Sequence, residues 1–589
     1  MKQFFKFVFA TVVGVVLCVV VLVVVLIGMV AVAGKEKKTA VEDNSILHVD
    51  VSYAIPERTV NSPLADFGFL GLGGKNTLGL NDILSNIRDA KTDNRIKGIF
   101  LDSSFMMSGF ATMEEIRNAL IDFRSTGKFI IAYSEIYSQG AYYLASVADK
   151  VYLNPEGYFR LTGFNAEHTF FKNALDKVGV EMQVIKVGTY KSAVEPFILD
   201  KMSEPNRMQV NAYLESLYGH FLGNIGKSRK IPADSLRSWA NTLKIRYPKD
   251  ALKYKLVDGL KYKDQVLDEM KKMTNTDLKD DLQSVTLADY AKADRTDSDD
   301  KGGSGRERIA VVYASGDIVS GKGDDNSIGS ETVSQALRKV RLDKKVKAVV
   351  FRVNSGGGSS LASEVIWREV DLTRKVKPVI VSMGDYAASG GYYIAAAADS
   401  IFAQPNTITG SIGIFGLYPN MQNLLNNKLG ITFDNVKTGK YADLGDVSRP
   451  LSVEERAILQ DQVNAGYQTF LTRVASGRKK TTAQVDSIGQ GRVWTGTQAL
   501  KIGLVDRIGS FNDAIVSAAK KAKLKTYRVV SYPEQKKFLE NFTDDAGKDI
   551  QTRVMQSQLG ENYGYWKQLQ DIMQTRGVQA QLPYRISIR

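Results

Sequence analysis

The chain has 589 residues, a length that predicts more than one domain, and its 44% hydrophobic and 24% charged residues are typical of globular proteins. This composition excludes a globally disordered or collagen-like chain. One cysteine and three histidines exclude an intrachain disulfide framework and disfavour a Cys/His zinc site or a histidine-based catalytic triad. The net charge of +14 comes without basic runs interleaved with aromatic residues, so we expect no nucleic acid partner.

The first informative segment is an apolar run at the N-terminus. Lys2 and Lys6 precede a charge-free stretch, Phe7 to Gly34, which as a helix at about 1.5 Å per residue exceeds the hydrocarbon core of roughly 30 Å. A cleaved signal peptide has a shorter apolar region of about 7–15 residues, although Ala31-Val32-Ala33 resembles a cleavage site. The sequence therefore predicts that residues 1–45 are a cytoplasmic stub and an uncleaved transmembrane signal anchor.

The rest of the chain contains an internal repeat with an offset of about 250 residues. Four segments of the first half match the second half in the same order: Lys97–Phe100 with Lys347–Val350, Gly140–Asp149 with Gly390–Asp399, Val178–Val180 with Leu429–Ile431, and Ala251–Asp258 with Ala499–Asp506. A period this long indicates duplicated domains rather than a solenoid of short repeats.

Short apolar strands alternate with amphipathic helices in each half. In the second half we expect strands at 309–313, 348–351 and 379–382, and helices over 331–340, 363–376 and 392–398. This alternation predicts an α/β fold with a mostly parallel sheet. The expected division is an N-terminal repeat, a flexible Gly/Ser-rich linker, a C-terminal repeat and a basic C-terminal extension, over residues 46–288, 289–308, 309–535 and 536–589.

The halves differ in two residues that can carry chemistry. Ser389 stands between Ala and Gly before a predicted helix, where the first half has Gln139, and Lys191 stands where the second half has Ala442. A serine in this place could be a helix N-cap, and most lysines are solvated surface charges. Because each half has the group that the other lacks, we expect one composite Ser/Lys site between the halves.

The second half also has three consecutive glycines directly after a predicted strand, in Asn354–Ser359. The first half has Ser104–Gly109 there, with two methionines in place of glycines. Consecutive glycines let the backbone turn tightly and present N–H groups to a developing negative charge, or they serve the turn alone.

Four segments together resemble the long, duplicated (protease IV) form of the signal peptide peptidase A family: Tyr190–Phe197, Asn354–Gly358, Ala388–Tyr393 and Thr409–Ile414. One departure is Gly356, where the family often has proline. The resemblance covers nearly the whole chain beyond the apolar run and implies tandem crotonase/Clp-protease-like α/β domains. It also implies a single-pass serine endopeptidase of the bacterial inner membrane, with periplasmic catalytic domains, which forms homotetramers and degrades released signal peptides.

The resemblance also implies the role of each site residue. Ser389 matches the nucleophile, Lys191 the general base, and Ser411 a serine that orients the lysine amine. Gly357 and Gly390 are the candidate N–H donors of the oxyanion hole. No metal, nucleotide or redox cofactor is needed for this chemistry, so we expect none.

A lysine acts as a base only when it is neutral, and its ordinary pKa is near 10.4. Burial among apolar groups lowers the pKa of an amine, so we expect a dry setting for Lys191 that Glu195, close in sequence, does not reach. Lys440 is a rival base, although the register of the repeat favours Lys191. A crotonase-like acyl-CoA enzyme and a non-catalytic membrane scaffold remain the alternative functions.

Overall fold

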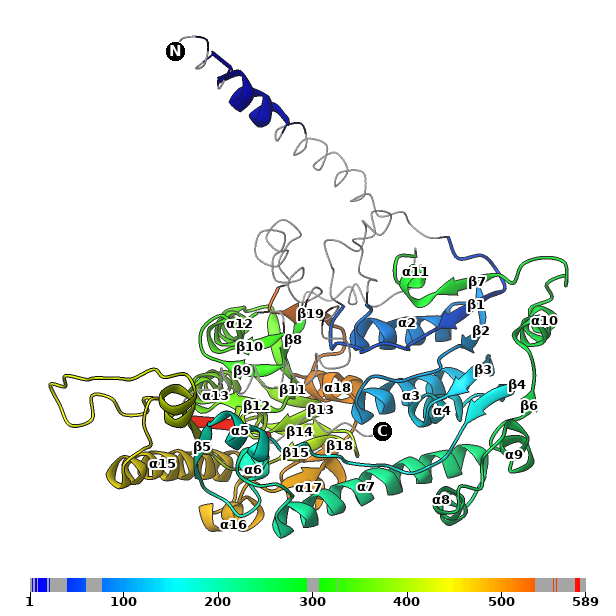
Figure 1. The fold of residues 1–589 in the computed structure, drawn as a ribbon. Coiled ribbons are helices and arrows are strands. Elements are labelled where there is room, and N and C mark those ends of the chain that lie inside the picture. The colour runs from blue at the N-terminus through cyan, green and yellow to red at the C-terminus, as the bar shows by residue number, and fades with distance from the viewer. Residues whose placement is uncertain are drawn as a thin grey trace.

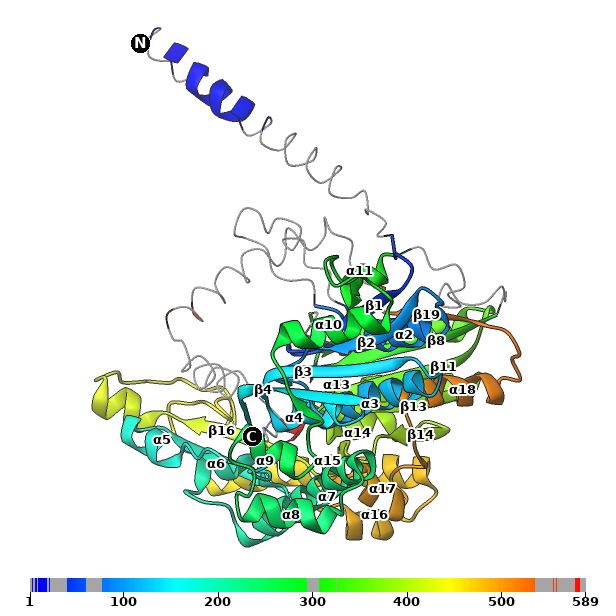
Figure 2. The same ribbon diagram turned by 90° about the vertical axis from the view of Figure 1, so that its right-hand side faces the viewer.

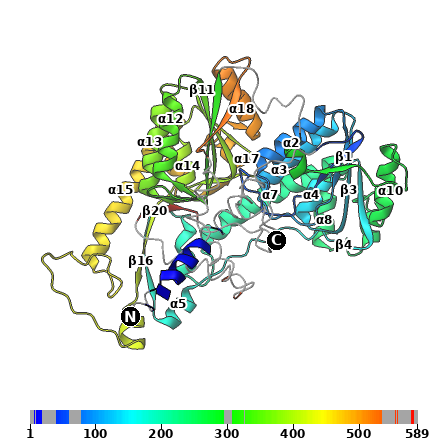
Figure 3. The same ribbon diagram turned by 90° about the horizontal axis from the view of Figure 1, so that it is seen from above.

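The computed structural model describes residues 40–59, 77–293, 307–324, 326–534 and 578–582, together with residues 3, 6, 7, 9–18, 21, 555 and 558. Two α/β halves lie side by side, and the long helix α7 (Glu204–Arg229) runs beneath both of them (Figure 1). The view from above separates the second half, drawn mostly in light green, yellow and orange, from the first half, drawn mostly in blue, cyan and teal (Figure 3).

The first half is built on a parallel sheet with the strand order β6-β4-β3-β2-β1-β7, which faces the viewer in Figure 2. Besides α7, the helices and strands of the first half are β1 (Ser45–Val49), α2 (Leu80–Thr92), β2 (Ile96–Leu101), α3 (Phe110–Arg124), β3 (Phe129–Tyr137), α4 (Gln139–Ala145), β4 (Lys150–Phe159), α5 (Lys172–Val178), β5 (Glu181–Lys186), η2 (Ser192–Val194), α6 (Glu195–Ile198), α8 (Ala233–Asn241), α9 (Pro248–Lys253), β6 (Gly259–Leu260), α10 (Lys263–Met273), β7 (Ser284–Thr286) and α11 (Leu287–Ala291).

The second half has a sheet in the order β17-β15-β13-β11-β8-β19, in which β14 also pairs with β13 and β18 pairs with β14, and all pairs except β15–β17 are parallel. Its elements are β8 (Arg308–Ser315), β9 (Asp317–Val319), β10 (Ser327–Gly329), α12 (Ser330–Leu342), β11 (Val346–Ser355), β12 (Gly357–Ser359), α13 (Ser360–Arg374), β13 (Val379–Ala388), α14 (Gly390–Ala395), β14 (Ser400–Ala403), β15 (Ile408–Gly410), β16 (Phe415–Asn420), η4 (Asn423–Lys428), α15 (Val453–Arg478), α16 (Thr482–Ile488), β17 (Val493–Thr495), α17 (Gly496–Lys501), β18 (Arg507–Ile508), α18 (Phe511–Lys521) and β19 (Arg528–Tyr532).

A third sheet joins segments that are far apart in the sequence. Its order is β10-β9-β12-β20-β16-β5, where β20 (Val578–Gln581) comes from the end of the chain and β5 from the first half. β5 pairs antiparallel with β16 over six consecutive positions, from Lys186 with Phe415 to Glu181 with Asn420. This pairing carries the chain that follows β5 into the second half.

The sheets follow from the sequence pattern. β11 is a run of Val, Ala and Phe with both faces covered, and Val349, Val350 and Phe351 are fully buried, as expected for a central parallel strand. Helix α12 buries Val333, Leu337 and others at helical spacing against this sheet. The predicted strands and helices of the second half are therefore confirmed as β8, β11, β13, α12, α13 and α14.

Two of the predicted segments, the N-terminal apolar run and the linker between the halves, are described only in part. Most of the apolar run from Phe7 to Gly34 lies outside the described residues, and no helix within the described parts of the chain has the length and apolarity needed to cross a bilayer. In the predicted linker, α11 extends to Ala291 and β8 begins at Arg308, while residues 294–306 lie outside the described residues.

A buried charged cluster joins the two halves next to the glycine-rich loop. Arg352 of β11 is 1% exposed and donates hydrogen bonds to Glu57 (2.8 Å) and to Glu115 of α3 (2.8 Å), both from the first half. Glu57 also accepts a hydrogen bond from Asn354 Nδ2 (2.8 Å). The first half therefore fixes the end of the strand that leads into the loop.

Because removal of one partner leaves a buried charge uncompensated, Arg352→Met should lower the free energy of unfolding by about 3–5 kcal/mol. Neutralising the acids as well, with Glu57→Gln and Glu115→Gln, should restore part of that loss. Urea unfolding measures both effects. The matched control is Arg338→Met, since Arg338 is 60% exposed in its ion pair with Glu369 and surface pairs contribute little. Equal losses in Arg352→Met and Arg338→Met would contradict the prediction.

Candidate active site

Ser389 lies at the sharp turn between β13, which ends at Ala388, and α14, which begins at Gly390. Its backbone has φ +54° and ψ −116°, a region that residues other than glycine rarely adopt. It occupies the N-cap position of α14 but makes no capping hydrogen bond, whereas Ser138 of the first half caps α4 by accepting from the Ala141 N–H. The interpretation of Ser389 as a helix cap is therefore wrong.

Lys191 reaches Ser389 from the other half of the chain. It follows β5 and directly precedes the short helix η2, so the β5–β16 pairing places it inside the second half. Lys191 Nζ lies 2.8 Å from Ser389 Oγ, 3.2 Å from Ser411 Oγ and 3.4 Å from the Ser411 carbonyl oxygen. The three side chains meet within one chain, in the composite arrangement that the repeat predicts.

The surroundings of Lys191 are closed to solvent. Its side chain is fully buried, and burial lowers the pKa of the amine to about 7. The ring of Phe415 lies 5.8 Å from Nζ, and Glu195 accepts hydrogen bonds from Ser203 Oγ (2.5 Å) and Asn206 Nδ2 (2.8 Å) instead. The prediction of a buried lysine without a bond to Glu195 is confirmed.

Two glycines of the second half make room for the lysine. A Cβ on Gly491 would lie 2.7 Å from Lys191 Cα, and Gly491 also has φ +77°, which only glycine adopts easily. A Cβ on Gly413 would lie 3.2 Å from Lys191 Cδ. The sequence shows these glycines but gives no sign that a lysine from the other half packs on them.

Gln209 of α7 holds the lysine segment in place, a role that the sequence does not indicate. Its Nε2 donates to the Tyr190 carbonyl (3.0 Å) and to Ser192 Oγ (3.0 Å), while its Oε1 accepts from the Val493 N–H (3.1 Å). One amide thus bridges the residues on both sides of Lys191 to strand β17. A glutamine within a long helix carries no sequence signal for this role.

The glycine-rich loop lies next to the turn at Ser389. Gly357 has φ +105°, and a Cβ there would lie 2.8 Å from the Gly390 nitrogen, so these two glycines are neighbours. Gly390 is the first residue of α14, where an N–H has no partner within the helix. The Gly357 N–H donates to Ser355 Oγ (3.1 Å). Both glycines lie beside the serine turn, with the Gly357 N–H engaged by Ser355 in this structure.

Lys440, the rival base, is not part of this site. Its side chain is 66% exposed and forms an ion pair with Glu454 at the surface, whereas Ser389 is fully buried. Gln139, at the position of Ser389 in the first half, has a structural role: it donates to the Gly163 carbonyl and accepts from the N–H groups of Thr162 and Gly163.

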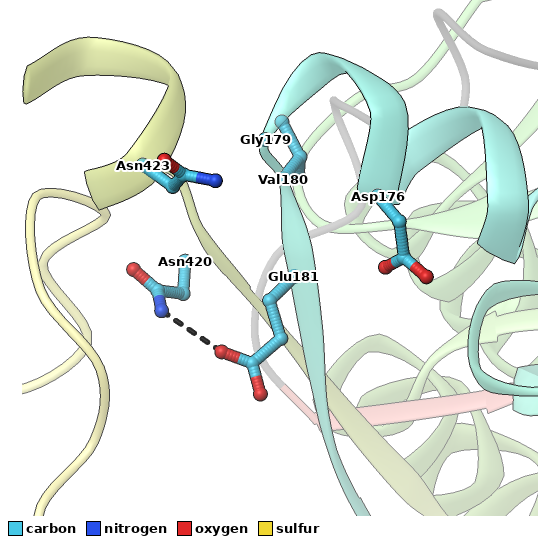
Figure 4. A pocket seen from close by; sticks show the side chains of 6 residues that line it. All are labelled: Asp176, Gly179, Val180, Glu181, Asn420 and Asn423. Carbon is cyan, nitrogen blue, oxygen red and sulfur yellow. Dashed lines mark hydrogen bonds between the residues drawn. The ribbon is translucent and has the colours of Figure 1, made fainter. Parts of the chain in front are cut away.

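A separate hollow of about 320 Å³ lies between the ends of β5 and β16 (Figure 4). Asn420 Nδ2 donates there to Glu181 Oε2 (3.0 Å). The remaining lining residues are Asp176, Gly179, Val180 and Asn423. None of the predicted site residues lines it, and within the described residues no cluster of three His, Cys, Asp or Glu side chains could hold a metal ion.

Known proteins resemble the chain in both halves. The sequence model of peptidase family S49 matches residues 122–277 and 371–525, one segment in each half. Protease 4 of Salmonella typhi is 40% identical over 475 residues, which are 79% of this chain and 75% of that protein. The chloroplastic serine protease SPPA of Arabidopsis thaliana is 32% identical over 512 residues, 86% of this chain and 74% of that protein.

Among solved structures, the match to the ClpP1 N165D mutant from Listeria monocytogenes covers 35% of this chain and 94% of that chain, with 16% identity and a TM-score of 0.24. The sequence relatives confirm the resemblance to the long form of signal peptide peptidase A. The chain belongs to peptidase family S49 and is a serine peptidase.

Proposed function

We propose that this serine peptidase is a membrane-anchored endopeptidase that degrades released signal peptides, with Ser389 as its nucleophile and Lys191 as its general base. The observation that carries the proposal is the distance of 2.8 Å between Lys191 Nζ and Ser389 Oγ, at an amine whose pKa burial lowers to about 7. The apolar run from Phe7 to Gly34 supports the anchor.

The rest of the proposal follows from the resemblance to signal peptide peptidase A. It comprises the released signal peptides as substrates, crotonase/Clp-protease-like halves, a homotetramer, and catalytic halves on the periplasmic face of the bacterial inner membrane. Lys2 and Lys6 precede the apolar run and Lys35, Lys37 and Lys38 follow it, so the positive-inside rule alone does not orient it and this topology rests on the resemblance.

In the proposed reaction, neutral Lys191 takes the hydroxyl proton as Ser389 Oγ attacks a peptide carbonyl carbon. The N–H groups of Gly357 and Gly390 stabilise the negative charge on the carbonyl oxygen, and the Lys191 ammonium then protonates the leaving amine. A water molecule, deprotonated by the same lysine, hydrolyses the acyl–Ser389 ester. Ser411 Oγ, 3.2 Å from Nζ, keeps the amine directed at Ser389.

Ser389→Ala and Lys191→Ala should each lower the hydrolysis of a synthetic signal peptide by about 10³-fold or more, because each removes a group that acts in the transition state. The assay uses the full chain in detergent, with gel filtration to show that assembly is unchanged. Lys440→Ala is the matched control and should keep near-normal activity. Near-normal hydrolysis by Lys191→Ala, with loss in Lys440→Ala, would contradict the assignment of the base.

The pH dependence of kcat/KM reports the protonation of the base in the free enzyme. Because neutral Lys191 is the active form and its pKa is about 7, kcat/KM should rise about tenfold per pH unit below pH 7 and level off above it. Steady-state hydrolysis from pH 5 to pH 9 measures this profile. A rate that falls as the pH rises through 7 would contradict a lysine base.

The same pKa shift makes a prediction about stability. Since the pKa of Lys191 is about 7 when folded and about 10.4 when unfolded, the unfolded chain binds more protons between these values, and folding stability should rise with pH there. Lys191→Met removes the cost of burying the amine, so the variant should gain about 4 kcal/mol over the natural protein at pH 7, and the gain should shrink towards pH 10.

Urea unfolding at both pH values measures this difference, with the exposed Lys227→Met as the control. A stability difference for Lys191→Met that stays constant from pH 7 to pH 10 would contradict the burial of a neutral amine.

A further inference from the structure

Strand β13 is irregular just before the turn that carries the candidate nucleophile. Its parallel pairing with β11 runs in register up to Val353 and Met383 and resumes with Ser355 opposite Ala387 (Figure 1). A single residue of β11 therefore lies opposite three residues of β13, 384–386, which bulge out of the ladder. A bulge bends its strand and redirects the residues that follow, and this one is followed by the serine turn.

Asn354 is the residue of β11 that lies opposite the bulge, and its side chain binds the bulge in place of the ladder. Its Oδ1 accepts from the Tyr386 N–H (3.1 Å), and its Nδ2 donates to Glu57 Oε1 (2.8 Å). A Cβ on Gly384 would lie 2.6 Å from that Glu57 oxygen and 2.8 Å from Asn354 Cγ, so the glycine in the bulge makes room for both side chains. One amide thus ties β11, the bulge of β13 and the first half together.

The chemistry of its two partners allows this amide only one orientation. A backbone N–H can only donate and an ionised carboxylate can only accept, so Oδ1 must face Tyr386 and Nδ2 must face Glu57. Arg352 binds the other Glu57 oxygen through its Nε (2.8 Å) and holds the carboxylate in place. The link therefore requires an amide in one partner and a carboxylate in the other.

The first half makes a different set of contacts at the equivalent place. Ser104 stands at the position of Asn354, and its Oγ lies 2.7 Å from Ser134 Oγ. The Ile136 N–H, at the position of Tyr386, donates to the same Ser134 Oγ (3.2 Å). The amide link thus accompanies the glycine-rich loop and the nucleophile, which only the second half has.

We propose that Asn354 is a positioning residue that sets the distance between the glycine-rich loop and Ser389, and that Glu57 holds its amide in the required orientation. The glycines begin two residues after Asn354, and Ser389 stands three residues after Tyr386, so the two parts of the site meet at this one side chain. This role rests on the proposed function, with Ser389 as the nucleophile and the loop as the oxyanion hole.

The proposed reaction is sensitive to this distance. An N–H donor stabilises the transition state when it lies about 2.7–3.1 Å from the place of the oxyanion. A displacement of about 1 Å lowers the rate by about 100-fold. Because the donors act on charge that develops in the transition state, their displacement should lower kcat and leave KM nearly unchanged.

Asn354→Asp tests the orientation of the amide. The new carboxylate can still accept from the Tyr386 N–H, but its second oxygen faces Glu57, and the two carboxylates repel each other. We expect kcat for the synthetic signal peptide to fall by about 100-fold, with KM nearly unchanged. The matched control is Asn420→Asp, since Asn420 donates in the same way to Glu181 in the separate hollow, and it should keep the natural kcat.

An exchange of the two groups separates the role of Glu57 from general damage to the fold. In Asn354→Asp combined with Glu57→Gln, the glutamine donates to the aspartate and its oxygen accepts from Arg352 Nε, while the net charge stays that of the natural protein. This double variant should have a kcat at least about tenfold above that of Asn354→Asp alone. A double variant as slow as Asn354→Asp, or a single variant with natural kcat, would overturn the proposal.

Asn354→Ser provides the test if the facing carboxylates prevent folding. Serine is the residue of the first half at this place, and its uncharged side chain is too short to link both partners, so kcat should again fall by about tenfold or more. Urea unfolding shows whether the variant is folded. A folded Asn354→Ser with natural kcat and KM would overturn the proposal.

Reaction with a fluorophosphonate distinguishes failure of the positioning role from failure of the proposed function. The probe phosphonylates an activated serine with loss of fluoride, and its phosphoryl oxygen takes up negative charge in the oxyanion hole, so labelling should slow in parallel with kcat. A natural protein that is labelled at Ser389 but cleaves no signal peptide would refute the proposed substrate, and the labelling rates would still decide the role of Asn354. Unchanged labelling in Ser389→Ala would refute the nucleophile and the positioning role with it.

Discussion

The burial of one amine is the constraint on which the site depends. Lys191 comes from the first half, yet its nitrogen lies 2.8 Å from Ser389 Oγ in the second half, and both side chains are fully buried. Removing an amine from water is unfavourable for its charged form, and this cost lowers its pKa to about 7. The rest of the structure must therefore hold the halves together strongly enough to keep the amine buried, which the pairing of β5 with β16 and the Arg352 cluster do.

The two halves use the equivalent turn, before α4 and before α14, for different purposes. At the turn before the helix, the first half has a serine that caps α4 and a glutamine that binds the Gly163 backbone, and both stabilise the fold. The second half has Ser389 at φ +54°, a conformation that costs about 1–3 kcal/mol and stabilises no helix end. The strained backbone conformation of Ser389 persists because the buried residues packed around the turn hold it there.

The sequence predicted most of the second half and the pair at the centre of the site. Buried parallel strands are continuous runs of Val, Ile and Ala, and the difference between repeats singles out Ser389 and Lys191. Gln209, Gly491 and Glu57 could not be predicted, since their roles depend on which distant segments pack together. The C-terminal extension was predicted from its charge alone, and charge does not reveal that residues 578–581 form a strand in the third sheet.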